Sequence, residues 1–146
     1  MTPNKTQVAH KNVLILRGAS GCGKSSFADF IKNGWWNPHD VAICCADDYH
    51  MFDGEYNFDP ANLGMAHSEC RTEFNSYVDL DYRVIIVANT NTKPKEFEFY
   101  ENLAKERGYN VTHIVIENRH GSNDVHDVPD KSKDRQKQNI KNSLTL

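Results

Sequence analysis

A glycine-rich octapeptide near the N-terminus has the residue types and the spacing to bind phosphate. This segment, GASGCGKS at residues 18–25, follows the apolar run VLILR and precedes SFADFI. It fits the pattern G-x-x-x-x-G-K-[ST] between a strand and a helix, which is the setting that a phosphate-binding loop requires. The glycines let successive backbone NH groups converge on an anion, and the following helix adds its positive end. The pattern predicts a bound magnesium nucleoside triphosphate.

The positions of this phosphate-binding loop, or P-loop, have distinct predicted roles. Lys24 is expected to bridge the β- and γ-phosphates in catalysis, and Ser25 is expected to bind Mg²⁺ through its hydroxyl. The expected nucleotide-binding residues are Gly18, Ala19, Ser20, Gly21, Cys22, Gly23, Lys24, Ser25 and Ser26.

An acidic pair after the second apolar run indicates where the phosphate goes. In the segment CCADDYH, Asp47 and Asp48 follow a predicted strand, at the same sheet edge as the P-loop. Asp47 can accept the proton of an acceptor hydroxyl that lies in line with the γ-phosphate. Asp48 can orient the substrate, reach the metal through water or cap the next turn. This arrangement is typical of a kinase.

Two other classes of P-loop enzyme find no support. A GTPase needs a base-reading N-K-x-D segment, which the sequence lacks. Motor-type ATPases end a strand in an acidic residue, but here the candidate strand VIIVA is followed by Asn89-Thr90-Asn91. We therefore expect a kinase with ATP and Mg²⁺ as its cofactors.

Four unbroken apolar runs predict the strands that position these residues. Unbroken runs are typical of parallel strands that are covered on both faces, whereas half-exposed strands alternate. The runs are residues 13–16, 41–45, 84–88 and 111–116.

Three helical patterns separate the predicted strands. The first has Phe27, Phe30 and Ile31 on one face and ends at Gly34. The second begins at Asp59-Pro60 and has the stripe Leu63, Ala66, Cys70, Phe74 and Tyr77. The third spans residues 92–107 and stops at Gly108, with Phe97, Tyr100, Leu103 and Ala104 inward. The alternation predicts a single α/β P-loop domain over residues 1–146, with a doubly wound, mostly parallel sheet and helices on both faces.

The C-terminal quarter is predicted to supply a lid and a basic helix. Residues 118–129, NRHGSNDVHDVP, form a polar loop without periodicity, and loops of that length are usually functional or disordered. A helix is expected over about residues 130–142, with five positive residues against one aspartate between 131 and 141. Because it has almost no apolar stripe, we expect this helix to dock loosely.

Composition limits the class of protein. Hydrophobic residues make up 38% and charged residues 25% of the 146 residues, and the mean hydropathy of -0.69 argues against a membrane span. The polar N-terminus predicts no signal peptide, so we expect a cytoplasmic protein. The formal net charge of -3 implies that any nucleic-acid partner is held locally. Four cysteines without CxxC spacing are expected to be buried, reduced thiols.

Four segments together resemble a known family. GxSGxGKS, ADDY, DGEYNFDPANLGMAHSEC and VIIVANTNTKPKEFEFYENLAKERGYNV are similar to the P-loop kinase domain of polynucleotide kinases and of related Nedd4-binding-protein-2-like and phage P-loop proteins. The resemblance spans about residues 13–116. It implies that Lys24 and Ser25 contact the phosphates and the metal, and that Asp47 is the general base.

The same family closes a lid whose arginines stabilise the transferring phosphoryl group. Arg119 is the only arginine of residues 118–129, so the resemblance implies that role for Arg119, with Arg135 as the alternative.

Two residues depart from the family pattern. His50 stands where phage polynucleotide 5′-kinases have an arginine that grips a nucleic-acid phosphate, and Asn89 stands where they have an aspartate. His50 can still donate to a phosphate, although less tightly than an arginine fork. Asn89 keeps a hydrogen-bonding role near Lys24 without the charge. Asp48, His50 and Asn89 are the expected substrate-binding residues.

The acceptor remains open at this point. The resemblance favours a hydroxyl on a nucleic acid, with DNA preferred: the 5-hydroxymethyl group of 5-hydroxymethyluracil in phage DNA, in the host cytoplasm if the protein is phage-encoded. The alternative acceptors are the 5′-hydroxyl of a polynucleotide and a hydroxyl of a small metabolite. A non-catalytic ATP-binding switch module is an alternative function. The aromatic cluster MFDGEYNF, residues 51–58, could stack a nucleobase or pack ahead of the next helix.

Overall fold

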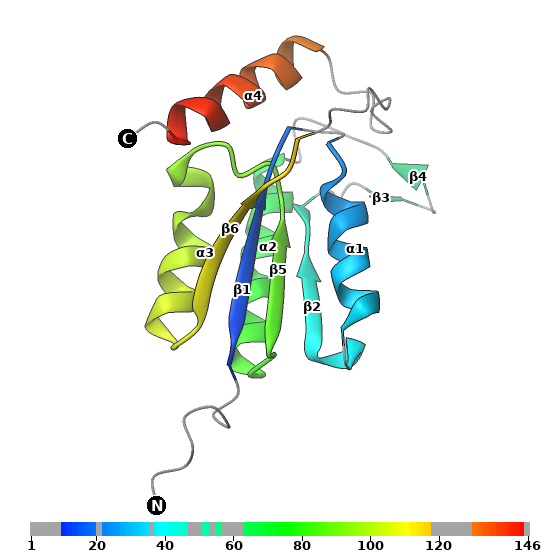
Figure 1. The fold of residues 1–146 in the computed structure, drawn as a ribbon, viewed down its shortest axis with the longest axis vertical. Helices are drawn as coiled ribbons and strands as arrows, with labels where there is room; N and C mark the ends of the chain where they lie inside the picture. The colour runs from blue at the N-terminus through cyan, green and yellow to red at the C-terminus, as the bar shows by residue number, and fades with distance from the viewer. Residues whose placement is uncertain are drawn as a thin grey trace, which may run out of the picture.

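A four-stranded parallel sheet with helices on both faces forms the centre of the protein (Figure 1). The computed structural model describes residues 10–19, 22–35, 37–46, 51–52, 55–56, 63–117 and 130–144. The sheet contains β1 (Asn12–Arg17), β2 (Val41–Cys44), β5 (Val84–Ala88) and β6 (Asn110–Val115) in the order β2-β5-β1-β6. Every pairing in it is parallel. The predicted α/β fold with a parallel, helix-covered sheet is confirmed.

The strand order places the end of β1 where ligands bind in such sheets. The chain passes from β1 outward to β2, returns to β5 beside β1, and then crosses to β6 on the other side of β1. Ligands of open α/β sheets bind beyond the carboxyl ends of the strands, at the point where this order reverses. The P-loop follows β1 directly and therefore lies at this point.

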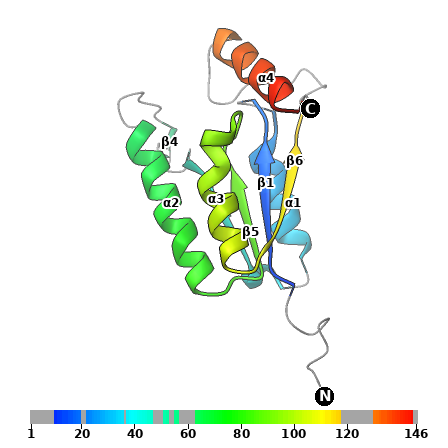
Figure 2. The ribbon, with the colours of Figure 1, turned by 90° about the vertical axis from the view of Figure 1, so that its left-hand side faces the viewer.

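Two helices cover one face of the sheet (Figure 2). These are α2 (Leu63–Asp79) and α3 (Pro94–Glu106). Helix α2 buries Ala66, Cys70 and Phe74 at intervals of four residues, as the sequence predicts. The rings of Phe74 and Tyr100 meet edge to face with centroids 5.0 Å apart, which joins the two helices above the sheet. The predicted start of the second helix at Asp59-Pro60 lies outside the described residues.

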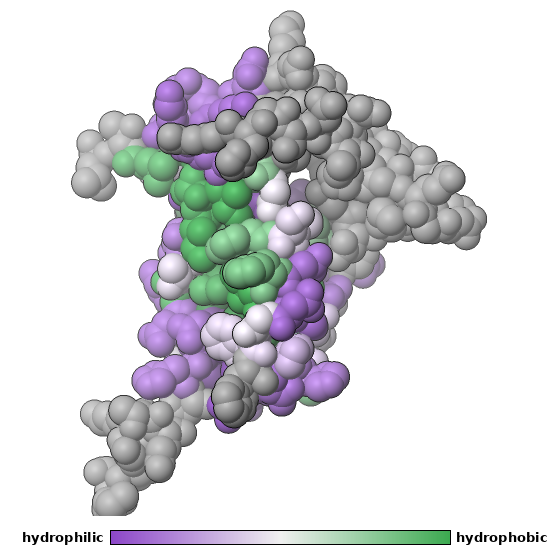
Figure 3. Space-filling view, turned by 45° about the vertical axis from the view of Figure 1, so that its right-hand side comes forward, coloured by the Kyte–Doolittle hydropathy of each residue, from purple (hydrophilic) through white to green (hydrophobic). Residues whose placement is uncertain are grey.

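A single described helix, α1 (Lys24–Gly34), covers the other face. Its inward stripe runs through Lys24, Ala28 and Ile31, and Ala28 is fully buried. Phe30 was expected to face the core but is 75% exposed, because it lies to one side of this stripe. Apolar side chains also gather in the middle of this face, below the hydrophilic α4 (Figure 3).

The remaining described elements are short. They are the 3₁₀ turn η1 (Pro38–Asp40) and the antiparallel pair β3 (Met51–Phe52) and β4 (Glu55–Tyr56). The pair falls within the predicted aromatic cluster, of which the structure describes only the backbone of these two short strands. Its role in stacking or packing stays a prediction.

Helix α4 (Asp130–Leu144) lies across the end of the sheet at which the parallel strands finish (Figure 1). The helix predicted for about residues 130–142 is therefore present, but its docking is more specific than expected. Ile140 is only 6% exposed, and Ser143 Oγ accepts a hydrogen bond from Arg17 Nη2 at 2.5 Å. Ile140 and Ser143 are thus two described side chains through which the helix docks, and a search for an apolar stripe misses both.

Two predictions from composition can be compared with the described residues. Within them, no helix is long and apolar enough to cross a membrane. Cys44, Cys45 and Cys70 are buried and form no disulfide, as expected. Cys22 is also free of a disulfide but is only partly buried, because it belongs to the P-loop at the surface of the sheet end.

Candidate active site

The turn from β1 into α1 has the geometry of an anion site. Gly23 precedes the helix with φ of 102°, a left-handed conformation that glycine adopts at little cost, and α1 begins at Lys24. No side chain caps the start of α1, and its first turn contains no acidic residue. The first backbone NH groups of a helix need an acceptor, and a phosphate can supply it. The geometry of the described part of the P-loop therefore fits the binding of a nucleoside triphosphate.

Gly18 is required by close packing between the P-loop and β6. A Cβ at this position would lie 2.4 Å from Cys22 Sγ and 2.7 Å from the carbonyl oxygen of Ile116. The Gly18 NH donates to the carbonyl of Thr90 at 3.0 Å. The start of the P-loop is therefore held between the ends of β5 and β6.

Lys24 is buried against the P-loop. Lys24 is only 8% exposed, and its Nζ donates to the carbonyls of Gly18 (2.9 Å) and Ala19 (3.0 Å). Cys22 Sγ lies 3.7 Å from the same nitrogen. These contacts keep a positive charge beside the loop that is expected to bind the phosphates.

The hydroxyl expected to bind Mg²⁺ is accessible. Ser25 and Ser26 are both exposed in the first turn of α1. Mg²⁺ usually keeps several waters and takes one or two protein ligands plus substrate phosphates, so a single hydroxyl fits this mode. Within the described residues, no cluster of three or more histidine, cysteine, aspartate or glutamate side chains forms a metal site.

Asn89 ties the end of β2 to β5. It is 7% exposed; its Oδ1 accepts from the backbone NH of Ala46 at 2.7 Å, and its Nδ2 donates to Cys70 Sγ at 3.6 Å. These partners differ from the expected neighbourhood of Lys24. The carboxamide of Asn89 therefore accepts from one of these partners and donates to the other.

Several predicted site residues lie outside the described residues. They are Ser20, Gly21, Asp47, Asp48, His50 and Arg119. Asp47 follows Ala46, the last described residue after β2, so the tether from Asn89 acts one residue before the expected general base. The roles of these residues stay predictions.

Arg17 is a buried residue that the sequence patterns did not single out. Its Nε donates to the carbonyl of Asn91 at 2.8 Å, and its guanidinium carbon lies 4.6 Å from the centroid of the Phe97 ring. Burial lowers the pKa of this guanidinium, and the carboxylates of Glu96 and Glu101 oppose that effect. Arg17 is the one charged residue of the mostly apolar strand β1, directly before the P-loop, and this position is the signal that could have identified it from the sequence.

Residues 89–92, of sequence NTNT, form a polar support at the end of β5. Asn91 is fully buried with φ of 47°, and its Nδ2 donates to the carbonyls of Leu16 (2.8 Å) and Asn89 (3.3 Å). The hydroxyls of Thr90 and Thr92 both donate to the Glu96 carboxylate. This NTNT segment holds both β1 and the start of the P-loop.

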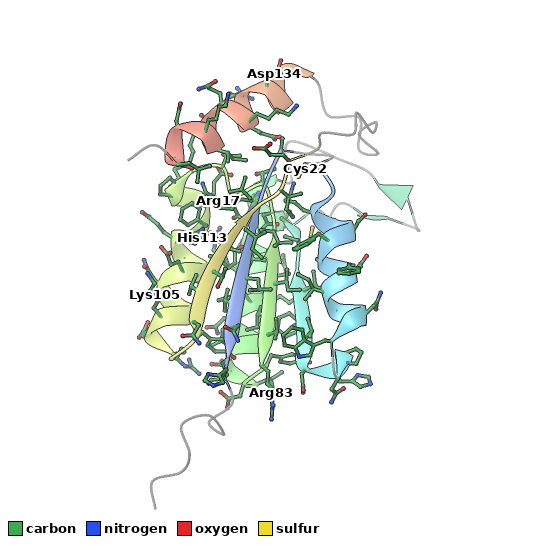
Figure 4. All side chains as sticks on the ribbon, viewed as in Figure 1. Arg17, Cys22, Arg83, Lys105, His113 and Asp134 are labelled. Carbon is green, nitrogen blue, oxygen red and sulfur yellow. The ribbon has the colours of Figure 1, made fainter. Side chains whose placement is uncertain are left out.

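A pocket opens on the other side of the P-loop, beneath α4. It has a volume of about 440 Å³, and we call it the α4 pocket. Ala19 and Cys22 line it from the P-loop, and residues 115–117 line it from the end of β6. In Figure 4, Cys22 and Arg17 lie at the end of the sheet below α4, and Asp134 lies on the helix above them.

The comparisons with known proteins agree with this fold. No family model matches the chain. It is 33% identical over 107 residues to human NEDD4-binding protein 2; the match covers 73% of this chain and only 6% of that protein. The expected resemblance to NEDD4-binding protein 2 is therefore confirmed as a similarity over a segment of that protein.

Solved structures extend the likeness to nearly the whole chain. A chain of the Pnkp1/Rnl/Hen1 RNA repair complex has a TM-score of 0.68 and 18% identity, over 97% of this chain and 48% of that one. A variant of the APS kinase CysC of Mycobacterium tuberculosis has a TM-score of 0.54 and 16% identity, over 92% of this chain and 97% of that one. At these identities the likeness establishes the fold, which is that of P-loop kinases.

Proposed function

We propose that the protein is a kinase that transfers the γ-phosphate of ATP to a hydroxyl group on a nucleic acid, with Mg²⁺ bound. The observation that carries this proposal is the hydrogen bond between Ala46 and Asn89, which fixes the end of β2 beside the strand that adjoins the P-loop. Asp47 comes next in the chain. A general base at this edge of the sheet is useful for transfer to a hydroxyl, and binding alone does not need it.

The chain's own residues divide the reaction between them. The NH groups of the P-loop and of the first turn of α1 bind the triphosphate, and Lys24 neutralises charge between the β- and γ-phosphates. The Ser25 hydroxyl holds Mg²⁺, which supplies further neutralisation of the phosphate oxygens when bound. Asp47 accepts the acceptor's proton while its oxygen bonds to the γ-phosphorus and the bond to the β-phosphate oxygen breaks, releasing ADP.

The remaining predicted residues have auxiliary roles in this proposal. Arg119, or Arg135 in its place, stabilises the transferring phosphoryl group. His50 donates to a phosphate of the nucleic acid, and Asp48 orients the acceptor. Asn89, which was expected to bind the substrate, positions the segment before the base through its hydrogen bond to Ala46.

Two acceptors are supported by different observations. His50 in place of an arginine weakens the grip on the phosphate of a strand end, which favours the 5-hydroxymethyl group of 5-hydroxymethyluracil within DNA. The likeness to a chain of an RNA repair complex favours the 5′-hydroxyl of a polynucleotide, DNA or RNA. The proposed mechanism serves both acceptors.

The test of the proposal is transfer of labelled γ-phosphate from ATP to four matched nucleic acids. Two are DNA and RNA with a free 5′-hydroxyl, one is end-blocked DNA with internal 5-hydroxymethyluracil, and one is end-blocked DNA with thymine. Label on the internal base alone identifies a DNA-modification kinase. Label on free ends alone identifies a polynucleotide 5′-kinase. Label on none of them refutes transfer to nucleic acid.

Asp47→Asn tests the general base in the same assay. We expect the rate of transfer to fall by about 10²–10⁴-fold while the affinity for ATP stays the same, because the amide cannot accept the proton. Asp29→Asn is the matched control, since Asp29 is an exposed carboxylate on α1. An unchanged rate of transfer for Asp47→Asn would show that Asp47 is not the general base, whereas a native protein that binds ATP but transfers no phosphate would favour a non-catalytic ATP-binding switch.

A further inference from the structure

The two edges of the central sheet differ in how they are closed. At the edge formed by β2, the backbone groups of Val41 are bonded within the chain: its NH donates to the carbonyl of Pro38, and its carbonyl accepts from Lys32 Nζ at 2.9 Å. The other residues of β2 are also mostly buried. The start of this edge is therefore closed by the chain's own groups.

The edge formed by β6 is open among the described residues. Asn110 at the start of β6 and Ile116 just after its end donate their NH groups to carbonyls of β1. Backbone groups alternate in direction along a strand, so those of Val111, His113 and Val115 point away from β1. Within the described residues, no strand lies beyond β6 to pair with them. These NH and carbonyl groups can therefore pair with another strand.

The side chains at this edge are incompletely covered as well. The apolar run of β6 predicts a strand buried on both faces, as β5 is. Five apolar residues here are only half-buried: Leu14 on β1, and Val111, Ile114, Val115 and Ile116 on or just after β6. Helix α1 packs on β2 and β5, and apolar side chains gather at the surface of this face in Figure 3. The edge thus offers apolar surface together with backbone groups.

Strand β6 has none of the features that keep an edge strand from pairing. Such edges are blunted by lysine, by proline or by a bulge. The sequence of β6, NVTHIV, contains no charged residue and no proline, and it pairs with β1 without interruption. Most of its residues are β-branched, which favours a further strand beside it.

We infer that two copies of the chain join through β6, antiparallel around a two-fold axis at His113, so that their four-stranded sheets become one continuous sheet. The outward backbone groups are self-complementary around this residue. His113 faces His113 of the other copy, Val111 faces Val115, and each pair exchanges both backbone hydrogen bonds. Two-fold dimers of this kind are the commonest assemblies of soluble proteins. The inference goes beyond the proposed function and does not depend on it.

The same register brings matching side chains together on the face of α1. Thr112 lies opposite Ile114 of the other copy in a pair without mutual hydrogen bonds, in which side chains approach most closely. Ile114 packs against the apolar cluster beneath α1, and Thr112 is exposed. The half-buried apolar surfaces of the two copies therefore become continuous.

Helix α3 meets its own copy in this arrangement, with complementary charges. It packs over β1 and β6, so the two helices lie two strand spacings apart, about 10 Å, a normal distance between packed helices. His113 Nε2 lies 2.9 Å from Glu101 Oε1, which places Glu101 beside the axis. Glu98 and Lys105 are exposed, about one turn to either side of Glu101. Because the helices run antiparallel, Lys105 of one copy lies near Glu98 of the other, which favours a second copy over an unrelated strand.

Sedimentation of the full chain at increasing concentration tests the inference. We expect the native protein to be a dimer at about 50 µM, as a dissociation constant in the low micromolar range gives. A monomer at every concentration up to about 200 µM would overturn the inference, because the β6 edge would then belong to another segment or partner.

Amide hydrogen exchange, measured by NMR, locates the contact. On dilution from dimer to monomer, exchange at Val111, His113 and Val115 should accelerate at least about tenfold. The NH groups of Thr112 and Ile114 point to β1 and are internal controls, since they should stay protected at both concentrations. Exchange at the first three that does not depend on concentration would overturn the inference.

Thr112→Lys and Thr72→Lys form a matched pair. Both threonines are exposed, but Thr72 lies on α2, away from the edge. Thr112→Lys puts a charge against Ile114 of the other copy, so we expect the dissociation constant to rise at least about tenfold, whereas Thr72→Lys should leave it within about twofold. Denaturant midpoints close to the native value show that both variants are folded. A dimer that Thr112→Lys leaves intact would place the contact elsewhere and overturn the inference.

Discussion

The NTNT segment and α4 support the P-loop from its two sides in different ways. The NTNT segment contacts the start of the P-loop and β1 through several short, buried hydrogen bonds, among them Gly18 to Thr90 and Asn91 to Leu16. Among the described side chains of α4, Ile140 is buried and Ser143 accepts a hydrogen bond from Arg17. The NTNT segment continues directly from a core strand, whereas α4 docks across the end of the sheet.

We expect the two sides to act on different parts of a bound nucleotide, the NTNT side on the phosphates and the α4 side on the nucleoside. The phosphates must be held in line with the acceptor, and a small displacement there is costly to the rate. The nucleoside contributes mainly to affinity, so a change beside it is expected to alter binding more than the rate. We therefore expect changes at the NTNT side to lower stability and turnover, and changes at the α4 side to alter the affinity for ATP.

Gly18→Ala should have the largest effect, because it disturbs both sides at once. The added Cβ would meet Cys22 Sγ at 2.4 Å and the Ile116 carbonyl at 2.7 Å, and the carbonyl belongs to the backbone. We expect the free energy of unfolding to fall by about 1–3 kcal/mol. We also expect the binding of inorganic tripolyphosphate to become too weak to measure. Denaturant unfolding and calorimetry measure the two effects.

A second substitution sharpens the Gly18 experiment. Cys22→Ala removes the sulfur contact but leaves the carbonyl in place, so Gly18→Ala combined with Cys22→Ala should recover only part of the stability. Full recovery would show that the sulfur alone sets the requirement for glycine. No loss in Gly18→Ala would contradict the packing described for the P-loop.

Asn91→Ala tests the NTNT side alone. It removes the donors to Leu16 and Asn89 from a fully buried position and places alanine at a positive φ. We expect a loss of about 2 kcal/mol in the free energy of unfolding, together with a lower kcat, since the frame of β1 and the P-loop loosens. Thermal unfolding and the transfer assay measure these quantities.

Asn91→Gly separates the two causes. Glycine also lacks the amide but accepts φ of 47°, so it should cost about 1 kcal/mol less than alanine at this position. If the two variants are equally stable, backbone conformation contributes nothing. If neither loses kcat, the NTNT side does not position the phosphates.

The sequence predicted the parts of the site that follow from local pattern. The P-loop is defined by residue spacing, and the apolar runs identified the strands from which it and the NTNT segment extend. Asn91 lies within this segment, but its buried hydrogen bond to the carbonyl of Leu16 depends on β1 and β5 lying side by side. Spacing along the chain carries no information on that pairing.

The α4 side was not predictable for a related physical reason. Sequence patterns detect a helix that docks through an apolar stripe. Helix α4 instead docks through Ile140 and through Ser143, which contacts the buried Arg17 126 residues away in the chain. Phe30 shows the reverse error, since its spacing suits a stripe that the packing of α1 does not use. Each case depends on which neighbour an element meets after folding.

Ser143→Ala should have the smallest effect and tests the α4 side alone. It removes the hydroxyl that accepts from Arg17, while the arginine keeps the carbonyls of Asn91 and Thr92. We expect the KM for ATP to rise about threefold, with kcat and tripolyphosphate binding unchanged, because α4, which lines the α4 pocket, loses its hydrogen bond to Arg17. Steady-state kinetics at saturating acceptor measures the change.

Ser143→Thr is the conservative control, since it keeps the hydroxyl and should restore the native KM for ATP. A fall in kcat equal to the rise in KM would contradict the division between the two sides, because α4 would then also position the phosphates. The same would follow if Ser143→Ala weakened the binding of tripolyphosphate as much as that of ATP. A change confined to the affinity for ATP would show that the contact with Arg17 acts through α4 and the α4 pocket, since the P-loop itself would be unaltered.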